Sequence, residues 1–357
     1  MHEELSGVWI MAYTTIDDPS AHFQTLLYTG NGSARSLTND GNSDLQADWI
    51  WIKERNNAVD HQLQDSSRGV TKTLQSNSNN GESTLSDIVT AFNSDGFSLG
   101  NNASWNENGD TYVAWQWKAN GGTTTSGGGN DSVSTSTHQA NTTSGFSVVT
   151  YTGNGTAGAT VAHGLGAVPQ VVLLKRRDAD GDTWQMYHHS LGNTHYLQLN
   201  NTDASTDGEV FNDTTPSSSV FTLHDFGASN GNNSTFVAYC FTPIQGYSKF
   251  DSYTGNGNAD GTFVYTGFKP AWIMVKKTNE AEAWFIADSK RTPINPNDDI
   301  IEANDQAAEG NSTTLDLLSN GFKFRHENGN TTGDSYLYMA FAESPFVSSE
   351  GVPTTAR

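Results

Sequence analysis

Short apolar stretches separated by runs of Gly, Asn, Ser and Thr dominate the pattern of hydrophobic and polar positions along the chain. The most apolar stretches are four residues long and each ends in lysine; they span 49–53, 171–175 and 272–276. Every position before the lysine is apolar, and many are β-branched or aromatic, which is typical of strands buried on both faces. The sequence therefore predicts a mainly β protein.

Smaller elements are expected between these runs. Further strands are predicted at 147–151, 220–223 and 262–265, where β-formers lie between turn residues. Two stretches allow short helices, 85–92 and 298–308, although the second is polar enough to form a loop instead.

The pattern of landmarks occurs three times. The string Tyr-Thr-Gly-Asn-Gly begins at Tyr28, Tyr151 and Tyr253, and one lysine-terminated run follows each copy. A phenylalanine and a similar closing string end each copy; the closing strings are 112–115, 236–239 and 338–341. Four landmarks in one order, with spacings that differ by at most two residues, indicate internal repeats.

These repeats divide the chain into segments. We predict three tandem antiparallel β-sandwich domains of jelly-roll or lectin-like type, preceded by an N-terminal arm. The Gly/Ser/Thr/Asn-rich segment after the first domain predicts a flexible linker without regular structure, so the first domain should be mobile. Only Ile244 and Gln245 separate the other two domains, so these two should be stiffly coupled. The predicted segments are arm 1–22, domain 23–118, linker 119–144, domain 145–243, domain 246–344 and tail 345–357.

Charge and composition narrow the function. The chain has 18 Lys and Arg residues against 39 Asp and Glu, a formal net charge of −21, so a phosphate backbone would be repelled and nucleic acid is not an expected partner. No apolar run approaches membrane-spanning length. Cys240 is the only cysteine, and residues 1–10 do not resemble a signal peptide. A particle assembled in a cytoplasm and released by lysis would fit an extracellular-looking protein of this kind.

Catalytic chemistry has little support in the sequence. No nucleophile elbow, phosphate-binding glycine loop or zinc-binding His-Glu-x-x-His motif is present. His188, His189 and His195 could suggest a metal site or a general base, but the repeats place Asp65, His188 and Asp288 in one slot. A slot that accepts both Asp and His favours a structural role. We therefore expect no catalytic residues, no enzyme activity and no required cofactor.

One acidic loop could bind calcium. Asp178, Asp180 and Asp182 form the densest acidic cluster in the chain, but they do not match the EF-hand pattern. The matching segments of the other repeats lack this acidic spacing. The loop is therefore interpreted either as a Ca²⁺ site or as a plain hairpin turn.

An unshared tryptophan marks a candidate binding loop. Trp184 and Trp284 share one slot and Trp115 matches Tyr239 and Phe341, so these aromatics are expected in the core. In contrast, Trp105 has no aromatic counterpart in the other repeats. Its loop is rich in Asn and Gly, so the predicted sugar-stacking or partner-contacting residues are Trp105, Asn106 and Asn108. The alternative is that Trp105 anchors the loop locally.

The N-terminal arm carries an apolar cluster outside the repeats, formed by Val8, Trp9, Ile10, Met11 and Tyr13. Such a cluster would be adhesive if left in water. We expect it to dock on another chain, either a neighbouring copy or a particle protein. The alternative is that the arm folds back onto the first domain as an extra strand.

Several of these stretches resemble one protein family. Residues 11–20 (Met-Ala-Tyr-Thr-Thr-Ile-Asp-Asp-Pro-Ser), 48–53 (Asp-Trp-Ile-Trp-Ile-Lys) and 91–97 (Ala-Phe-Asn-Ser-Asp-Gly-Phe) resemble virion-associated proteins of marine tailed bacteriophages. Members commonly begin at the position of Met11, so residues 1–10 are a departure. The resemblance implies a structural or host-recognition role on the virion and supplies no catalytic motif.

The resemblance and the repeats together lead to one expected function. We expect a virion protein, tail- or fibre-associated, that contributes to host-surface recognition. Other virion proteins and a host-surface glycan or receptor would be its partners, and we expect a homo-oligomer. One alternative is a capsid-decorating or adaptor protein that contacts only other virion proteins. Another is a lectin-like carbohydrate-binding protein.

Overall fold

The computed structural model describes residues 12–354 apart from 129, 134 and 312. Within these residues the chain is all-β, and its only α-helices are the four-residue α1 (Ala103–Asn106) and α2 (Gly227–Asn230). The stretches 85–92 and 298–308 are not helical; they contain β7 (Val89–Phe92) and β24 (Ile301–Glu302). The prediction of a helix at 85–92 was wrong, because a segment this short gains little from local helix formation and follows its tertiary contacts. Residues 298–308 form mostly loop, which is the alternative that their polarity suggested.

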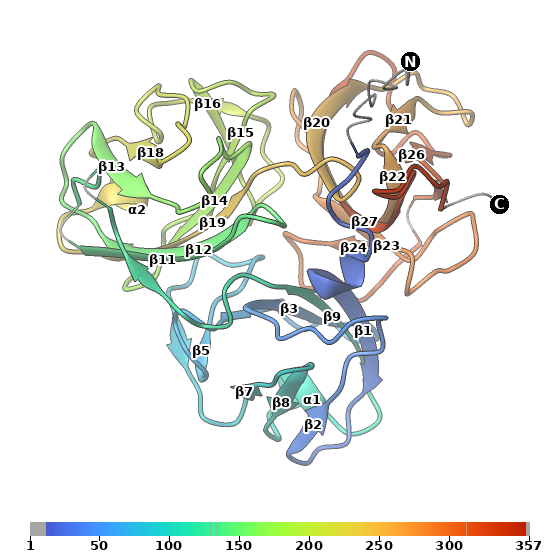
Figure 1. Ribbon diagram of the computed structural model, residues 1–357, viewed down its shortest axis with the longest axis horizontal. Helices are drawn as coiled ribbons and strands as arrows, with labels where there is room; N and C mark the ends of the chain where they lie inside the picture. Colours follow the sequence, from blue (N-terminus) through green and yellow to red (C-terminus); the bar gives the residue numbers. More distant parts are fainter. Residues whose placement is uncertain (1–11, 129, 134, 312, 355–357) are drawn as a thin grey trace, which may run out of the picture.

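Three large antiparallel sheets share one order of strands, and we call them, with the smaller sheets packed on them, units 1, 2 and 3 (Figure 1). The shared strands, in order across each sheet, are β1 (Phe23–Thr29), β9 (Thr111–Trp117), β3 (Trp49–Glu54) and β4 (Gln62–Asp65) in unit 1; β12 (Phe146–Thr152), β19 (Thr235–Phe241), β14 (Val171–Arg176) and β15 (Gln185–His188) in unit 2; and β20 (Ser248–Thr254), β27 (Ser335–Pro345), β22 (Phe268–Lys277) and β23 (Phe285–Asp288) in unit 3.

A smaller sheet packs on each large one, in the manner of a β-sandwich. A separate cluster of buried apolar side chains fills the space between the two sheets in each unit. The strands of the small sheets, in order, are β2 (Arg35–Leu37), β8 (Phe97–Leu99) and β7 in unit 1; β13 (Ala159–Ala162) and β18 (Val220–Leu223) in unit 2; and β21 (Phe263–Tyr265), β26 (Gly321–Phe324) and β25 (Leu315–Leu318) in unit 3.

The segment expected to be a flexible linker contributes strands to unit 2. Here β11 (Thr135–Asn141) pairs with β12 along its whole length, and β10 (Thr125–Ser126) pairs with β11. Hydroxyl groups face each other across the first pair, as in Thr137 and Thr150 at 2.9 Å. An edge strand can form from polar β-branched residues when a ladder partner is available. The prediction of a segment without regular structure was therefore wrong.

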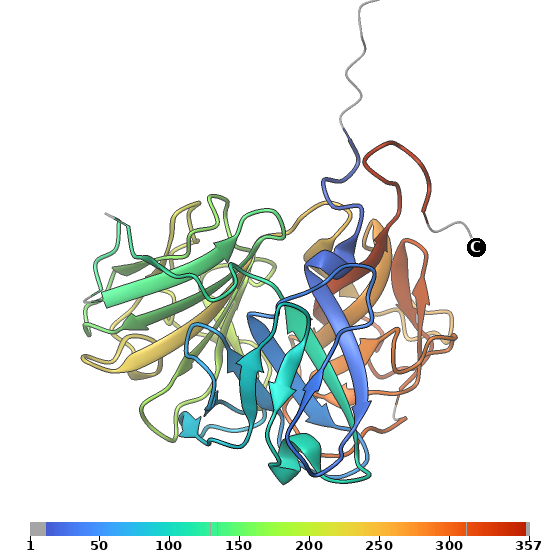
Figure 2. The ribbon, with the colours of Figure 1, turned by 60° about the horizontal axis from the view of Figure 1, so that its bottom comes forward.

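The three units meet around a shared hydrophobic core, which gives the molecule three lobes (Figures 1 and 2). Aromatic rings from all three units pack there. Ring centroids are 4.3 Å apart for Trp49 and Tyr239, 5.6 Å for Trp117 and Trp272, and 5.8 Å for Phe241 and Phe341. Because unit 1 packs against both other units in this core, the prediction that it moves freely was wrong.

The lysine-terminated runs lie between two cores. In β3, Ile50 and Ile52 point into the core of unit 1, whereas Trp49 and Trp51 point into the shared core. Successive residues of a strand face opposite sides, so a strand between two cores is apolar throughout. The prediction of strands buried on both faces is confirmed.

The structure corrects one match between the repeats. Tyr28 pairs with Tyr112, Tyr151 with Phe236, and Tyr253 with Tyr336. The third closing string therefore begins at Tyr336 and not at Tyr338. A shift of two residues leaves every side chain on the same face of a strand, so the apolar pattern alone does not reveal it.

Candidate functional site

A buried asparagine holds each Tyr-Thr-Gly-Asn-Gly loop. In unit 1 the hydroxyl of Tyr28 donates to the carbonyl oxygen of Trp105 at 2.7 Å, and the backbone N–H of Asn31 donates to Asn106 Oδ1 at 3.0 Å. Gly30 passes so close that a Cβ there would lie 2.0 Å from the carbonyl oxygen of Glu107. The motif therefore encodes a loop clamped against α1.

Units 2 and 3 use the same clamp. Backbone N–H groups donate to Asn230 Oδ1 at 3.0 Å and to Asn330 Oδ1 at 3.1 Å. All three clamping asparagines are fully buried. An Asn at a nearly fixed distance after each tyrosine was present in the sequence, and comparing polar as well as apolar positions would have found it.

The structure excludes a stacking role for Trp105. Its side chain is only 2% exposed, and its Nε1 donates to Gln64 Oε1 at 3.0 Å. Asn106 is the clamping residue, and only Asn108 is exposed. The prediction of a sugar-binding loop formed by Trp105 and Asn106 was wrong, because an aromatic residue without a counterpart in the repeats can still be buried.

The acidic loop makes ion pairs. Arg176 Nε lies 2.8 Å from Asp178 Oδ1, and Arg176 Nη1 lies 3.1 Å from Asp182 Oδ2. Asp180 Oδ1 accepts a hydrogen bond from the backbone N–H of Gly81 in unit 1 at 2.7 Å. No group of three His, Cys, Asp or Glu side chains in the described part of the chain is placed to hold a metal ion. The predicted calcium site is therefore not formed by these carboxylates.

Of the predicted docking arm, Val8, Trp9, Ile10 and Met11 lie outside the described residues, but the segment after them contacts unit 3 of the same chain. The Tyr13 hydroxyl donates to the carbonyl oxygen of Gly267 at 2.7 Å, and Thr14 Oγ1 donates to that of Gln245 at 2.8 Å. Ile16 is buried in the shared core. Tyr13 therefore contacts unit 3 and does not add a strand to the first domain, so that alternative was wrong. Docking on another chain stays a prediction.

His188 and His189 of unit 2 lie at the boundary with unit 3. Nε2 of His189 is 2.8 Å from the carbonyl oxygen of Phe250, and Nε2 of His188 is 3.4 Å from that of Tyr338. Burial lowers the pKa of His188 to about 3, so this imidazole is neutral in the folded protein at neutral pH. These contacts fit the structural interpretation.

A ring nitrogen of each unit forms a hydrogen bond with a backbone carbonyl oxygen of the previous unit. One side chain per unit, four residues before the slot of Asp65, His188 and Asp288, makes this contact. Unit 1 contacts unit 3 in the same way, so the ring of units is closed. The contacts are Trp184 Nε1 to Gln75 O at 2.8 Å, Trp284 Nε1 to Gln198 O at 3.1 Å, and His61 Nε2 to Glu302 O at 3.0 Å.

The interface between units 1 and 2 contains a buried charge network. Arg68 pairs with Asp65 and lies 3.1 Å from Glu82, which also accepts from Arg177 of unit 2 at 2.8 Å. The hydroxyl of Tyr239, also in unit 2, donates to Asp65 Oδ2 at 2.8 Å. Although burial opposes ionisation, hydrogen bonds and charge from both arginines hold the pKa of Glu82 below its ordinary value.

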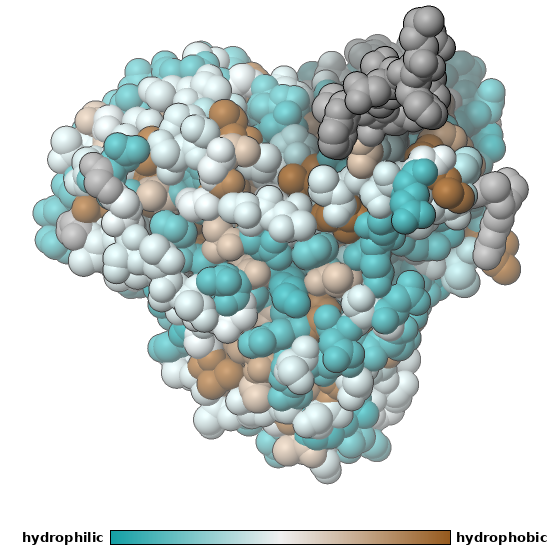
Figure 3. Space-filling model, in the orientation of Figure 1, coloured by the Kyte–Doolittle hydropathy of each residue, from teal (hydrophilic) through white to brown (hydrophobic). Residues whose placement is uncertain are grey.

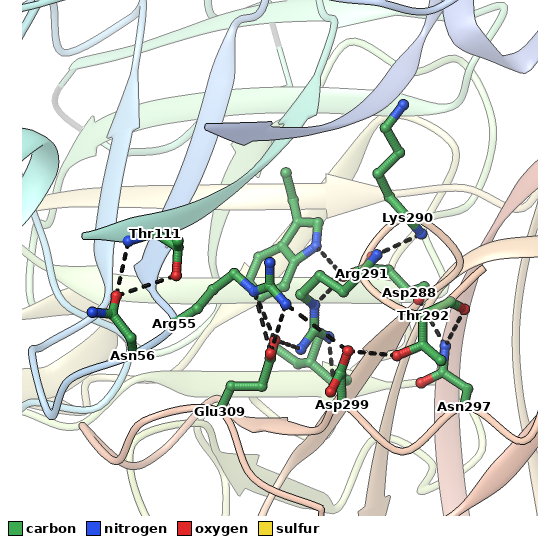
Figure 4. Close-up of polar contacts among 12 residues, drawn as sticks. Arg55, Asn56, Thr111, Asp288, Lys290, Arg291, Thr292, Asn297, Asp299 and Glu309 are labelled. Atoms are coloured by element: carbon green, nitrogen blue, oxygen red, sulfur yellow. Dashed lines mark hydrogen bonds and ion pairs between the residues drawn. The ribbon is translucent and has the colours of Figure 1, made fainter. Parts of the chain in front are cut away.

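The interface between units 3 and 1 repeats this network with different residues (Figure 4). Arg291 Nε lies 2.6 Å from Asp288 Oδ2, and Arg291 Nη1 lies 2.8 Å from Glu309. Glu309 lies between two guanidinium groups, because Arg55 of unit 1 approaches it at 2.7 Å. Nε1 of Trp115 in unit 1 donates to Asp288 at 3.0 Å, as the hydroxyl of Tyr239 donates to Asp65 at the other interface.

The interface between units 2 and 3 lacks this network among the described residues. His188 and Leu191 occupy the slots of the buried aspartate and arginine, and Thr278 occupies the slot of Arg55 and Arg177. Backbone contacts remain, such as Ser205 N–H to the carbonyl oxygen of Thr278 at 2.8 Å. The ring therefore has two interfaces with a buried charge network, which we call charged, and one without it, which we call neutral.

A fully buried lysine lies one residue before the end of strands β3, β14 and β22. Burial lowers the pKa of Lys53, Lys175 and Lys276 to about 8. Each of these amino groups donates hydrogen bonds to backbone carbonyl oxygens. Two of the contacts cross between units, Lys175 Nζ to Asn79 O and Lys276 Nζ to Thr202 O, both at 3.1 Å.

A family model described as a domain of unknown function, DUF7483, matches residues 18–345. The chain belongs to this family. No curated protein matches it. The matched region runs from just before β1 to the end of β27, so one DUF7483 domain contains all three units together.

A groove of about 670 Å³ opens on unit 3 of this DUF7483 domain. The loop 292–295 forms one wall and the β25–β26 turn forms another, and Lys269 and Glu343, 2.6 Å apart, also line it. The connection between β23 and β24 that supplies the first wall is longer than its counterparts in units 1 and 2. The volume lies in the range of small-ligand pockets.

No helix in the described residues is long and apolar enough to cross a membrane.

Proposed function

We propose that this protein is a structural component of a bacteriophage virion, tail- or fibre-associated, that contributes to host-surface recognition. The observation that carries the proposal is the closed ring of three similar units, each joined to the previous one by the same ring-nitrogen contact. A single chain thereby makes one closed body with three outer surfaces. We further propose that the units are copies of one β-sandwich domain of jelly-roll or lectin-like type.

Such a body suits attachment and display. Three similar surfaces can contact a partner of threefold symmetry or present three sets of loops at once. The visible face is mainly hydrophilic or neutral (Figure 3), in keeping with a net charge of −21, and the loops are rich in Asn, Asp and Gly. The resemblance of residues 11–20, 48–53 and 91–97 to virion proteins of tailed phages supports placing this body on a particle.

Immunogold electron microscopy tests the location. Antibodies raised against the recombinant chain are expected to label the tails of particles from the phage that encodes it. Label on the head would support the alternative, a capsid-decorating or adaptor protein. Absence of label on particles, with label in the infected cell, would contradict a virion role altogether.

A homo-oligomer and contacts with other virion proteins are part of the same proposal. Sedimentation velocity of the isolated chain tests the first, and crosslinking of purified particles tests the second. The remaining alternative, a lectin-like carbohydrate-binding protein, is favoured by one specific surface on unit 3.

A further inference from the structure

Two aromatic side chains stand exposed on strand β21 of unit 3. Phe263 is 46% exposed and Tyr265 is 48% exposed, and the buried Val264 lies between them. Alternate residues of a strand point to the same side and lie about 6.6 Å apart, twice the rise per residue. The pair therefore presents two neighbouring rings on one face, with a spacing close to the length of one pyranose unit.

The other two units show that the fold does not need aromatics at these positions. Val264 pairs with Phe322, as Val161 pairs with Phe221 and Leu37 pairs with Phe97. These pairs align the three strands. The slot of Phe263 is then occupied by Ser36 in unit 1 and Thr160 in unit 2, and the slot of Tyr265 by Thr38 and Ala162. Only unit 3 places exposed rings there.

Neighbouring groups hold both rings in place. The Phe263 ring lies against Gly321, where a Cβ would approach two ring carbons to 3.0 Å. Lys249 Nζ lies 5.6 Å from the centre of the Tyr265 ring and donates to the carbonyl oxygen of the same residue at 2.8 Å. The Tyr265 hydroxyl is 3.3 Å from that of Tyr13. Rings that are already ordered lose little conformational entropy when a ligand stacks on them.

The size of the patch indicates its ligand. A buried aromatic side chain contributes 150–250 Å², so two half-exposed rings offer roughly 200 Å². A stable protein interface needs about 800 Å² from each partner. The patch is therefore too small for a stable protein partner, but it matches one or two sugar rings.

The rim of the patch is polar and charged. Lys323 lies opposite Phe263 on β26 and pairs with Asp260, which also lies 3.0 Å from Arg325. Lys249 lies 3.7 Å from Asp251. A pyranose has an apolar C–H face and a rim of hydroxyl groups. Aromatic rings complement that face, and paired charges donate to and accept from hydroxyls.

We propose that Phe263 and Tyr265 form a stacking platform for a glycan. The inference rests on the proposed role in host recognition and deepens it, because it names a ligand class and a site. It places this site on unit 3, not on the loop around Trp105.

Affinity electrophoresis of the full chain tests the platform. Native gels contain laminarin, dextran, yeast mannan or bacterial O-polysaccharide, and the natural protein is expected to be retarded by at least one of them. The variant Phe263→Ser/Tyr265→Thr, which carries the residues of unit 1, is expected to bind at least tenfold more weakly. Phe226→Ser removes another exposed ring, 43% exposed and in unit 2, and should leave the retardation unchanged.

A second variant protects the test against loss of folding. Tyr265→Thr alone keeps the contact between Phe263 and Gly321 and is expected to lose most of the retardation, with an unchanged thermal unfolding midpoint. The proposal fails if no polysaccharide retards the natural protein, or if the folded variants are retarded as strongly as it is. It also fails if retardation requires removal of residues 1–11, because that segment would then be the occupant.

Sedimentation velocity tests whether a second copy of the chain occupies the patch. A dimer of the natural protein that the double substitution dissociates would assign the patch to self-association and overturn the proposal. Immunogold labelling of the tail does not depend on glycan binding. Labelled tails with no retardation in any gel would therefore overturn the platform and leave the proposed function standing.

Discussion

The charged and neutral interfaces of the ring solve the same packing problem with different chemistry. Between units 1 and 2, Asp65 and Arg68 are buried beside Glu82, whereas His188 and Leu191 fill the corresponding slots between units 2 and 3. The same backbone accepts either arrangement. Buried charges are therefore not required for the interface to form, in agreement with the high desolvation cost of buried ion pairs.

The difference follows how the units are connected. Units 2 and 3 are joined directly through Ile244 and Gln245, and a short connection gives the two surfaces a high effective concentration. Unit 1 is joined to unit 2 through the longer segment that contains β11, and it has no direct connection to unit 3. The charge network therefore occurs at the two interfaces whose units are joined by a long segment or are not joined directly.

Removing one arginine should give the largest effect. Arg68→Leu introduces the residue of the neutral interface but leaves Asp65 and Glu82 buried with fewer partners, so we expect a loss of about 3–5 kcal/mol in the free energy of unfolding. Urea denaturation measures this loss. The double variant Asp65→His/Arg68→Leu reproduces the neutral pair and should recover a large part of it. A loss below about 1 kcal/mol in the single variant would show that the network contributes little.

The asparagine clamps lie inside the units and should not distinguish them. Replacing Asn106, Asn230 or Asn330 by Ala leaves buried backbone groups without partners, so we expect a loss of about 1–3 kcal/mol at each position. Asn108→Ala, at an exposed neighbour, is the control and should change stability by less than about 0.5 kcal/mol. Strongly unequal losses would mean that the clamps also support the interfaces.

The buried lysines should respond to pH in all three units. Their pKa values near 8 in the folded protein lie below the ordinary value of 10.5, so the unfolded chain binds more protons between these limits. Stability should therefore rise from pH 8 to 10, by on the order of 1–2 kcal/mol per lysine. Above pH 10 the buried tyrosines, whose pKa values burial raises, should reverse the trend. Urea denaturation across this range measures it, and Lys276→Met should reduce the slope by about one third.

The smallest effect is expected at the rim of a charged interface. Lys290 of unit 3 lies 2.8 Å from Asp40 of unit 1, and both side chains are largely exposed. Water and salt screen such pairs, so Lys290→Ala should cost about 0–1 kcal/mol and less at high salt. Thermal unfolding at two salt concentrations measures it. A loss as large as that of Arg68→Leu would remove the contrast between rim and centre.

The sequence predicted the elements that depend on local apolar patterns. The strands that end in Lys53, Lys175 and Lys276 were placed correctly, as was the shared slot of Asp65, His188 and Asp288. The closing string of unit 3 was misplaced, because a shift of two residues preserves the pattern of a strand. Strand β11 was missed because its stability comes from the ladder with β12.

Site prediction failed where burial decided the outcome. Trp105 looked available because its neighbours are polar, yet its ring packs in the hydrophobic core of unit 1. Phe263 and Tyr265 lay within a predicted strand, and no local signal separates an exposed ring from a core ring there. Comparison of equivalent positions becomes informative once the pairing of strands aligns the repeats correctly.

Two interfaces are enough to hold three units together, so a closed ring of three units has one interface more than it needs. Since unit 1 also holds unit 3 through His61 and Arg55, loss of a single interface would open the ring into an arc without releasing a lobe. Any one boundary can therefore change in sequence while the other two keep the lobes together. His188 and Leu191, in the slots of a buried aspartate and arginine, are a difference of that kind. They lie at the interface between units 2 and 3, where the short peptide connection also holds the two units together.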